Sequence, residues 1–265
     1  MKRKIEILLL SDLHLGSFGC RARELNRYLR SIDPEMVILN GDIIDMWQFK
    51  KRYWPDHHMR VIKQLIKIAS KVPVYYITGN HDEALRKYSD FHLGNLKLVD
   101  KLELEIDGDR YWIFHGDIFD TAMKNARWLA KLGAIGYDTL IWTNTVVNWI
   151  LESLGRERMS FSKRIKNRVK KAVSYISDFE ETAGTIAIEN HYDYVVCGHI
   201  HQPAMKTIHT KRGSVKYLNS GDWIENLTAL EYKNGSWSMY HYDAAQFAEQ
   251  EMKEKLIVHL NRKSA

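Results

Sequence analysis

The chain has 265 residues, of which 45% are hydrophobic, which suits one large globular domain or a domain with an insertion. Two cysteines are too few for a disulfide framework, so a reducing compartment is expected. The net charge of +6 is compatible with acidic partners. The apolar run Ile5–Leu10 is too short for a secretory leader, and polar residues interrupt the longest apolar region, Leu129–Leu154. We therefore expect a soluble protein or one at a membrane surface.

The first third of the chain alternates apolar runs with amphipathic segments. Strands are expected over Ile5–Leu10, Met36–Leu39 and Val74–Thr78. Helices are expected over Arg21–Ile32 and His57–Lys71, with His57 and His58 on the surface at the start of the second. Strand–helix–strand alternation predicts a layered α/β sheet whose site lies beyond the carboxyl ends of its strands.

The rest of the chain contains more strands, separated by a long region without a strand signal. The expected strands are Leu96–Val99, Leu102–Ile106, Tyr111–Phe114, Tyr192–Cys197, Val215–Leu218, Leu227–Tyr232 and Trp237–Tyr240. Asp107-Gly108 and Asn234-Gly235 are hairpin-turn sequences. Residues from Thr121 to about Gly184 are expected to be helical, and so are Ala244–Val258.

Polar residues of the kinds that bind metals follow five of the apolar strands. The stretch Gly79-Asn80-His81-Asp82 comes directly after one of them. The other four stretches are Asp12-Leu13-His14, Gly41-Asp42, His115-Gly116-Asp117 and Gly198-His199-Ile200-His201. In an extended segment, residues i and i+2 point the same way, so Asp-x-His and His-x-His each aim two side chains at one point. Each stretch alone is a weak signal, but all five strand ends could converge on one site.

These five blocks, in this order, resemble the calcineurin-like metallophosphoesterase superfamily. The resemblance implies a double-layered β-sandwich flanked by helices (αββα) that carries two metals at one edge. It covers the chain apart from the helical region. We therefore expect a core formed by residues 1–120 and 185–265, with residues 121–184 inserted as a helical cap.

Carried over to this chain, the resemblance implies a set of seven metal ligands. One ion would take Asp12, His14, Asp42 and His201, and the other would take Asp42, Asn80, His115 and His199, with Asp42 bridging. Carboxylate, amide and imidazole ligands suit divalent manganese, which we expect, or iron or zinc. Two such ions neutralise phosphate charge and supply a hydroxide nucleophile at neutral pH.

The resemblance assigns catalytic roles to two residues that are not ligands. His81 is expected to protonate the leaving group or to stabilise charge on the phosphoryl oxygens, and Asp82 is expected to orient His81. Asp45 and Trp47, just after Asp42, are expected to pack the loop.

A closer resemblance is to UDP-2,3-diacylglucosamine hydrolases. It rests on Ser11–Gly16, Gly41–Trp47, the helical insertion, Gly198–Pro203 and Asn219–Trp223. Those enzymes cleave the pyrophosphate of a nucleotide-linked glycolipid in lipid A synthesis, releasing UMP and 2,3-diacylglucosamine 1-phosphate. Their best-known members carry arginine where this chain has His81, so the reaction type is implied more firmly than the substrate.

The insertion also has a distinctive charge. Residues 156–171 carry a net charge of +7 and the whole chain +6, so the rest of the chain is close to neutral. The simplest interpretation is a solvated helix face. Apolar residues also recur at helical spacing, so this helix could lie at the inner face of the cell membrane or hold an anionic nucleotide. The candidate substrate contacts are Lys163, Arg164, Lys166 and Arg168.

Two other classes of function remain open. A nuclease of the same superfamily would use the same metals, and a basic segment suits phosphate backbones. The insertion has no recognised nucleic-acid motif, however, and no nucleic-acid partner is expected. A non-catalytic scaffold is disfavoured because all seven expected ligands are present. We expect a cytoplasmic enzyme that contacts the membrane peripherally, and the sequence does not indicate its oligomeric state.

Overall fold

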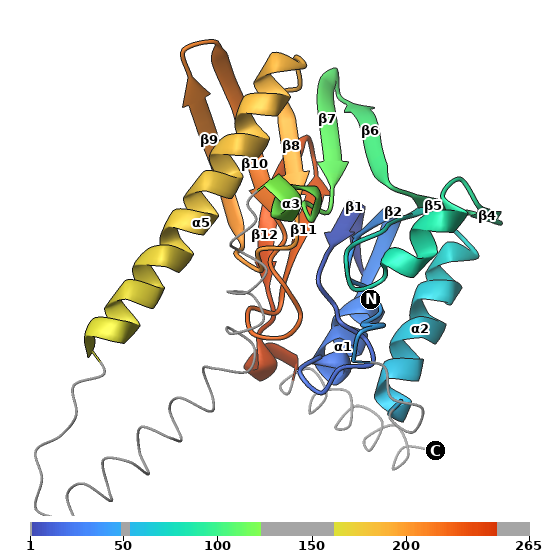
Figure 1. Cartoon of the computed structure of the whole chain (residues 1–265). Helices are drawn as coiled ribbons and strands as arrows, with labels where there is room; N and C mark the ends of the chain where they lie inside the picture. Colours follow the sequence, from blue (N-terminus) through green and yellow to red (C-terminus); the bar gives the residue numbers. More distant parts are fainter. Residues whose placement is uncertain (1, 49–53, 123–161, 248–265) are drawn as a thin grey trace, which may run out of the picture.

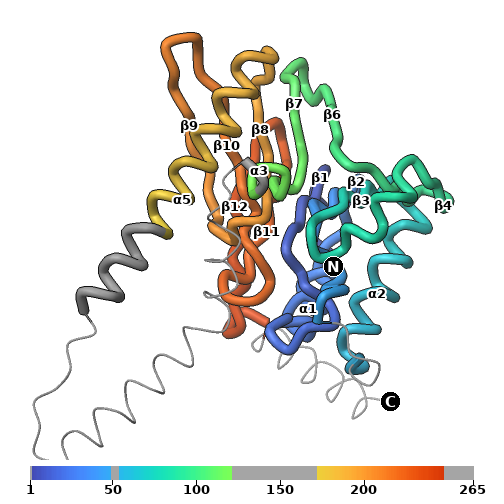
Figure 2. Tube along the Cα trace, viewed as in Figure 1, coloured from blue at the N-terminus to red at the C-terminus, as the bar shows by residue number. Residues whose placement is uncertain are grey.

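The computed structural model describes residues 2–48, 54–122 and 162–247, and the described elements form two stacked sheets with helices outside them (Figures 1 and 2). The first sheet has the strand order β12-β11-β1-β2-β3-β5-β4. Its strands are β1 (Arg3–Leu10), β2 (Ile32–Asn40), β3 (Val74–Ile77), β4 (His92–Leu93), β5 (Leu96–Val99), β11 (Thr228–Lys233) and β12 (Ser236–His241). β1, β2, β3 and β5 are parallel, so their carboxyl ends lie along one edge.

The second sheet has the strand order β6-β7-β8-β10-β9. Its strands are β6 (Lys101–Ile106), β7 (Asp109–Phe114), β8 (Tyr194–Cys197), β9 (Ala204–Thr210) and β10 (Gly213–Asn219). β7, β8 and β10 are parallel to one another. The ends of β7 and β8 therefore supply a second group of loops to the same site.

Helices cover the outer faces of both sheets. They are α1 (Ala22–Ser31), α2 (Asp56–Ala69), the 3-10 helix η1 (Glu83–Tyr88), α3 (Ile118–Ala122) and α5 (Ser162–Glu189). Among the described helices, none is long and apolar enough to cross a membrane. In Figure 1, α1 and α2 lie beside the first sheet and α5 runs along the second.

Three apolar clusters hold these layers together. Along β1, Ile7 and Leu9 belong to the cluster between the sheets, whereas Leu8 and Leu10 belong to the cluster under α1 and α2. Alternate side chains of a strand point to opposite faces, so β1 is buried on both faces, as its continuous apolar run predicts. A third cluster joins α3 and α5 to the second sheet through Phe119, Phe179 and their neighbours. The order of layers is helix, sheet, sheet, helix, which is the predicted sandwich.

The predicted strands agree with the structure, and so do both hairpin turns. Asp107 and Gly108 have φ of 54° and 87°, and Asn234 and Gly235 have φ of 53° and 73°. Two consecutive residues with positive φ match the twist of the flanking strands, which explains the preference for Asn or Asp followed by Gly. β9 was not predicted, because most of its side chains are partly or fully exposed and it lacks an apolar run.

Two further predictions need comment. His58 was expected on the surface, but it is 1% exposed, and its Nδ1 accepts a hydrogen bond from the Gly16 backbone N–H at 2.9 Å. The proposed cap lies mostly outside the described residues. Helix α5 runs from Ser162 to Glu189 across the proposed cap boundary at 184, and its last three turns pack on the second sheet. The division into core and cap stays a prediction.

Candidate metal centre

The loops after the parallel strands continue the pairing of their strands beyond the sheet. The backbone N–H groups of Asp12 and His14 donate to the carbonyls of Gly41 and Asp42 at 3.1 and 2.9 Å. The N–H of Gly198 donates to the carbonyl of His115 at 2.9 Å, which joins the ends of β7 and β8. These bonds join four ligand-bearing stretches in two pairs, one at the end of each sheet.

Five of the seven predicted ligands adopt left-handed backbone conformations. Their φ values are 54° for Asp12, 48° for His14, 54° for Asp42, 67° for His199 and 53° for His201. A residue with a side chain rarely adopts this region, and such conformations cluster at functional sites because they cost energy that the surrounding fold must supply. These strained residues lie in the loops whose side chains converge on the candidate metal centre.

Glycines provide the space for this convergence. A Cβ at Gly79 would lie 2.3 Å from Asp42 Oδ1, and a Cβ at Gly198 would lie 2.8 Å from Asp12 Oδ2. Any other residue at these positions would collide with a predicted ligand. The glycines of the Gly-Asn and Gly-His blocks are therefore required by close approach.

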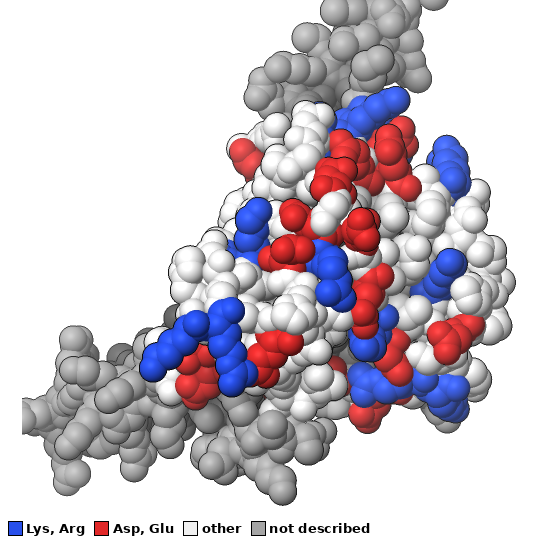
Figure 3. Space-filling model, turned by 90° about the horizontal axis from the view of Figure 1, so that it is seen from above, with Lys and Arg blue, Asp and Glu red and all other residues white. Residues whose placement is uncertain are grey.

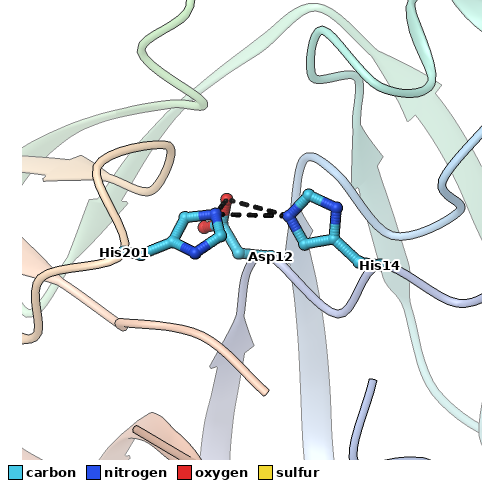
Figure 4. A group of neighbouring side chains, drawn as sticks. All are labelled: Asp12, His14 and His201. Carbon is cyan, nitrogen blue, oxygen red and sulfur yellow. Dashed lines mark hydrogen bonds and ion pairs between the residues drawn. The ribbon is translucent and has the colours of Figure 1, made fainter. Parts of the chain in front are cut away.

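Asp12, His14 and His201 form one group that could hold a cation (Figure 4). The Nε2 atoms of His14 and His201 lie 3.2 Å apart, and His201 Nε2 lies 3.2 Å from Asp12 Oδ1. Each imidazole also turns its Nδ1 toward a carboxylate, Asp45 for His14 at 3.4 Å and Asp222 for His201 at 3.5 Å. If Nδ1 carries the proton, the two Nε2 lone pairs face each other, an arrangement that a cation between them stabilises.

Asp42 lies between this group and a second one, formed by Asp42, His115 and His199. Its Oδ2 faces three imidazole Nε2 atoms, of His115 at 3.4 Å, His14 at 3.8 Å and His81 at 3.9 Å. Its Oδ1 accepts the backbone N–H of His81 at 2.8 Å. One carboxylate oxygen thus reaches both groups, which is the geometry that a bridging ligand requires.

A separate observation indicates that the second group could hold a cation. Asn80 Oδ1 and His115 Nε2 are buried and have no hydrogen-bond partner among the described residues. The other nitrogen of His115, Nδ1, is held by the carbonyl of Asn40 at 2.9 Å. Buried polar atoms without partners are costly, so these two atoms are suited to a positive ion.

His81 was expected to act beside the metals. It belongs to neither of the two groups above, but with His14 and Asp45 it forms a third group that could hold a cation, so its catalytic role stays a prediction. Its Nδ1 lies 3.0 Å from Asp45 Oδ1, and its ring stacks on Trp47 with centroids 4.0 Å apart. Trp47 is 52% exposed, so it covers one face of the imidazole without closing the site. Asp45 and Trp47 were predicted to pack the loop. Instead, Asp45 is buried between two imidazoles and Trp47 supports one of them.

Asp82 was expected to orient His81, and its contacts correct this prediction. Its carboxylate accepts the backbone N–H groups of Gly79 at 2.6 Å and Ile43 at 2.9 Å, and the hydroxyl of Tyr76 at 2.6 Å. Asp82 therefore closes the turn that presents Asn80 and His81. The carboxylate that faces Nδ1 of His81 is Asp45, in the loop after β2.

The electrostatics of the site favour charged carboxylates. Burial opposes ionisation of Asp42, but the imidazoles of His115, His14 and His81 hold its pKa well below the ordinary value. Burial disfavours a charged His201, yet Asp12 and Asp222 raise its pKa to about 9. In the absence of metal, protons on His115 and His201 balance part of this negative charge.

A model of the family described as calcineurin-like phosphoesterase matches residues 5–203, which include all of these loops. The chain belongs to the calcineurin-like phosphoesterase family. It is therefore a metal-dependent hydrolase of that family, and its His/Asp groups are suited to divalent metals.

Sequence similarity to curated relatives covers more of the chain than the family model does. A UDP-2,3-diacylglucosamine hydrolase of Shewanella sp. (strain MR-4) is 26% identical over 232 residues, or 84% of this chain and 92% of the relative. That of Shewanella putrefaciens is 26% identical over 234 residues, or 84% and 91%. A solved archaeal phosphodiesterase covers 89% of this chain and 98% of its own, at 14% identity and a TM-score of 0.43.

The structure also identifies residues that sequence reasoning missed. Asp45, Asp120 and Asp222 each hold a histidine of the site. Asp45 and Asp222 lie in stretches that carried the resemblance, but nothing in their spacing showed which imidazole they would meet. The four candidate substrate contacts, Lys163, Arg164, Lys166 and Arg168, lie on the first turns of α5, where side chains fall outside the described residues.

Proposed function

We propose that this protein hydrolyses the pyrophosphate bond of UDP-2,3-diacylglucosamine, giving UMP and 2,3-diacylglucosamine 1-phosphate. The observation that carries the proposal is the match to UDP-2,3-diacylglucosamine hydrolases over 92% of a relative's length, which extends well beyond the metal-binding loops. The family membership supports the reaction type. Manganese, with iron or zinc as alternatives, is the metal that the ligand set favours.

The chain's own residues suggest how the reaction proceeds. Asp12, His14, Asp42 and His201 would hold one ion, and Asp42, Asn80, His115 and His199 the other. Two divalent ions supply positive charge that neutralises a phosphate and lowers the pKa of water. His81 faces the same centre through Nε2, 3.9 Å from Asp42 Oδ2. Protonated there, it donates a proton to the leaving oxygen, while Asp45 holds its Nδ1 and Trp47 its ring face.

Selectivity for a lipid must come from outside the metal centre, because such a centre treats most phosphate esters alike. We assign it to the inserted segment 121–184. Its basic residues match the phosphates, and its apolar residues match the acyl chains. On the face shown in Figure 3, the described basic and acidic side chains are interspersed. The excess positive charge is instead in residues 156–171 of the sequence, which also supports a peripheral position on the inner face of the membrane.

A substrate panel with mass-spectrometric identification of the products tests the proposal. It contains UDP-diacylglucosamine, its deacylated analogue, a cyclic nucleotide and single-stranded DNA. Each buried acyl CH₂ contributes about 0.8 kcal/mol, so the diacylated substrate should react much faster than its analogue at low concentration. Equal rates for the two would contradict the lipid assignment, and preferential cleavage of DNA would make the protein a nuclease.

Charge neutralisation provides a second arm of the experiment. Replacing Lys163, Arg164, Lys166 and Arg168 together by Gln should slow lipid hydrolysis more than hydrolysis of a small chromogenic phosphodiester. The matched control replaces four exposed cations on and just after α2, namely Arg60, Lys63, Lys67 and Lys71. This control should change neither rate. If both substrates lose activity equally, the segment does not select the lipid.

A further inference from the structure

Every imidazole of the centre has one nitrogen that faces an oxygen outside the predicted ligand set, but in His199 this is the opposite nitrogen from the others. In His14, His81, His115 and His201 the nitrogen that faces the oxygen is Nδ1. In His199 it is Nε2, which lies 2.9 Å from Asp120 Oδ1. A neutral imidazole has one N–H and one lone pair, so a proton on Nε2 would leave the lone pair of His199 Nδ1 available to a metal.

Asp120 is itself held by a residue from a distant part of the chain. The hydroxyl of Tyr175, on α5, donates to the same Oδ1 at 3.0 Å. Asp120 is 8% exposed and lies on α3, and the neighbouring Phe119 packs edge-on against Phe179 of α5 with centroids 5.4 Å apart. Burial and Asp120 raise the pKa of Tyr175, so its hydroxyl remains a proton donor at neutral pH.

We propose that Asp120, braced by Tyr175, is a positioning residue that holds His199 with its proton on Nε2 and directs Nδ1 toward the second metal. The inference rests on the metal-binding part of the proposed function and is independent of the substrate. A carboxylate that accepts the second N–H of a metal-binding histidine fixes its tautomer and makes it a stronger ligand. Here Asp120 is held by Tyr175 of α5. The same helix carries the candidate substrate contacts, which begin about two turns before Tyr175.

Metal titration of the metal-free protein tests this proposal without any substrate. The wild type should bind two equivalents of Mn²⁺. Asp120→Ala should weaken one equivalent by about 10–100-fold and leave the other unchanged. Asp120→Asn should have a smaller effect, because the amide oxygen still accepts the Nε2 proton. Tyr175→Phe, which removes only the brace, should have the smallest.

A matched control separates positioning from general damage to α5. Glu180 is a second buried carboxylate on this helix, and it pairs with Lys206 on β9 rather than with the centre. Glu180→Gln should bind both equivalents as the wild type does, even if it lowers the melting temperature. Selective loss of one equivalent in the Asp120 variants but not in Glu180→Gln supports the proposal.

The tautomer gives a spectroscopic readout. Long-range ¹H–¹⁵N spectra of the protein loaded with Zn²⁺ should show His199 protonated on Nε2, in contrast to His14, His115 and His201. If His199 is protonated on Nδ1, or if Asp120→Ala and Asp120→Asn both bind metal as the wild type does, the proposal is wrong. If the wild type binds no second equivalent, the proposed function fails and this inference fails with it.

Discussion

Two of the carboxylates that support histidines of the metal centre, Asp45 and Asp120, do so from different kinds of structure. The Asp45 cluster consists of Asp45, His14, His81 and Trp47, and all of its members come from loops after the first three parallel strands of one sheet. The Asp120 cluster consists of Asp120, His199 and Tyr175. It joins α3, the end of β8 and α5, which approach each other only when α5 packs on the second sheet.

The comparison shows that one metal centre depends both on the formation of a sheet and on the packing of helices. Neighbouring parallel strands place their carboxyl ends side by side, so the Asp45 cluster forms once the first sheet forms. The Asp120 cluster additionally requires the packing of α3 and α5, which residues 123–161 separate in the sequence. We therefore expect the Asp45 cluster to govern the proton donor and one metal, and the Asp120 cluster to govern the other metal and its dependence on α5.

Asp42 lies between the two clusters, so its removal should have the largest effect. Asp42→Ala takes away the oxygen that faces His14, His81 and His115. It should lose both metal equivalents and essentially all activity. Elemental analysis of the purified variant checks this result. Near-full occupancy would show that the centre does not depend on a shared ligand.

His81 isolates the catalytic part of the Asp45 cluster. His81→Ala should keep both metals, because neither of the two proposed ligand sets includes His81, but it should lower kcat by about 10²–10⁴-fold. A substrate whose leaving group needs no proton, such as a nitrophenyl ester, should be affected less. Metal loss with an unchanged rate per bound metal would instead make His81 a ligand.

Asp45 provides the direct counterpart of Asp120. Its carboxylate contacts both His14 and His81, so Asp45→Asn should weaken the metal held by His14 and slow proton donation, each by about 10–100-fold. The Asp120 variants should weaken the other metal and spare the proton donor. Metal titration combined with the leaving-group dependence of kcat distinguishes the two patterns. Identical patterns would mean that the clusters are not separable.

The smallest expected effect is on the pH dependence of the free energy of unfolding. It comes from His58, which accepts a hydrogen bond from the loop after β1 that carries His14. Burial, with a contribution from His57, lowers the pKa of His58 to about 4, from 6.5 in a model peptide. The unfolded chain therefore takes up this proton near pH 6.5 and the folded protein only near pH 4. The contribution of His58 is complete above pH 6.5 and decreases as the pH falls toward 4, by about 3 kcal/mol.

Denaturant unfolding of the wild type and His58→Gln at several pH values measures this contribution. Glutamine can still accept the Gly16 N–H but does not titrate, so the difference between the two proteins should change only between pH 6.5 and 4. His57→Gln, at a half-buried neighbouring position, removes only the smaller cause of the lowered His58 pKa and should retain most of the slope. A constant difference over this range would show that His58 does not titrate as described.

The family resemblance implied the order of the layers and the seven expected ligands, whereas the sequence alone determined most of the strands and the edge at which the polar blocks meet. It could do so because runs of apolar residues mark buried strands, and parallel strands bring their carboxyl ends to one edge. The five polar blocks at those ends could therefore be predicted to meet. The edge strand β9 escaped prediction because an exposed strand has no apolar run to mark it.

Only the tertiary structure decided which carboxylate supports which imidazole. Asp82 follows His81 directly in the sequence but turns to the backbone of Gly79 and Ile43, whereas Asp45, 36 positions earlier, faces the ring. Asp120 reaches His199 because helices α3 and α5 pack together over the second sheet, and His58 is buried because a loop after β1 folds over it. Spacing along a chain fixes the direction of side chains within one strand or helix. Contacts between elements depend on how those elements pack, which local spacing does not specify.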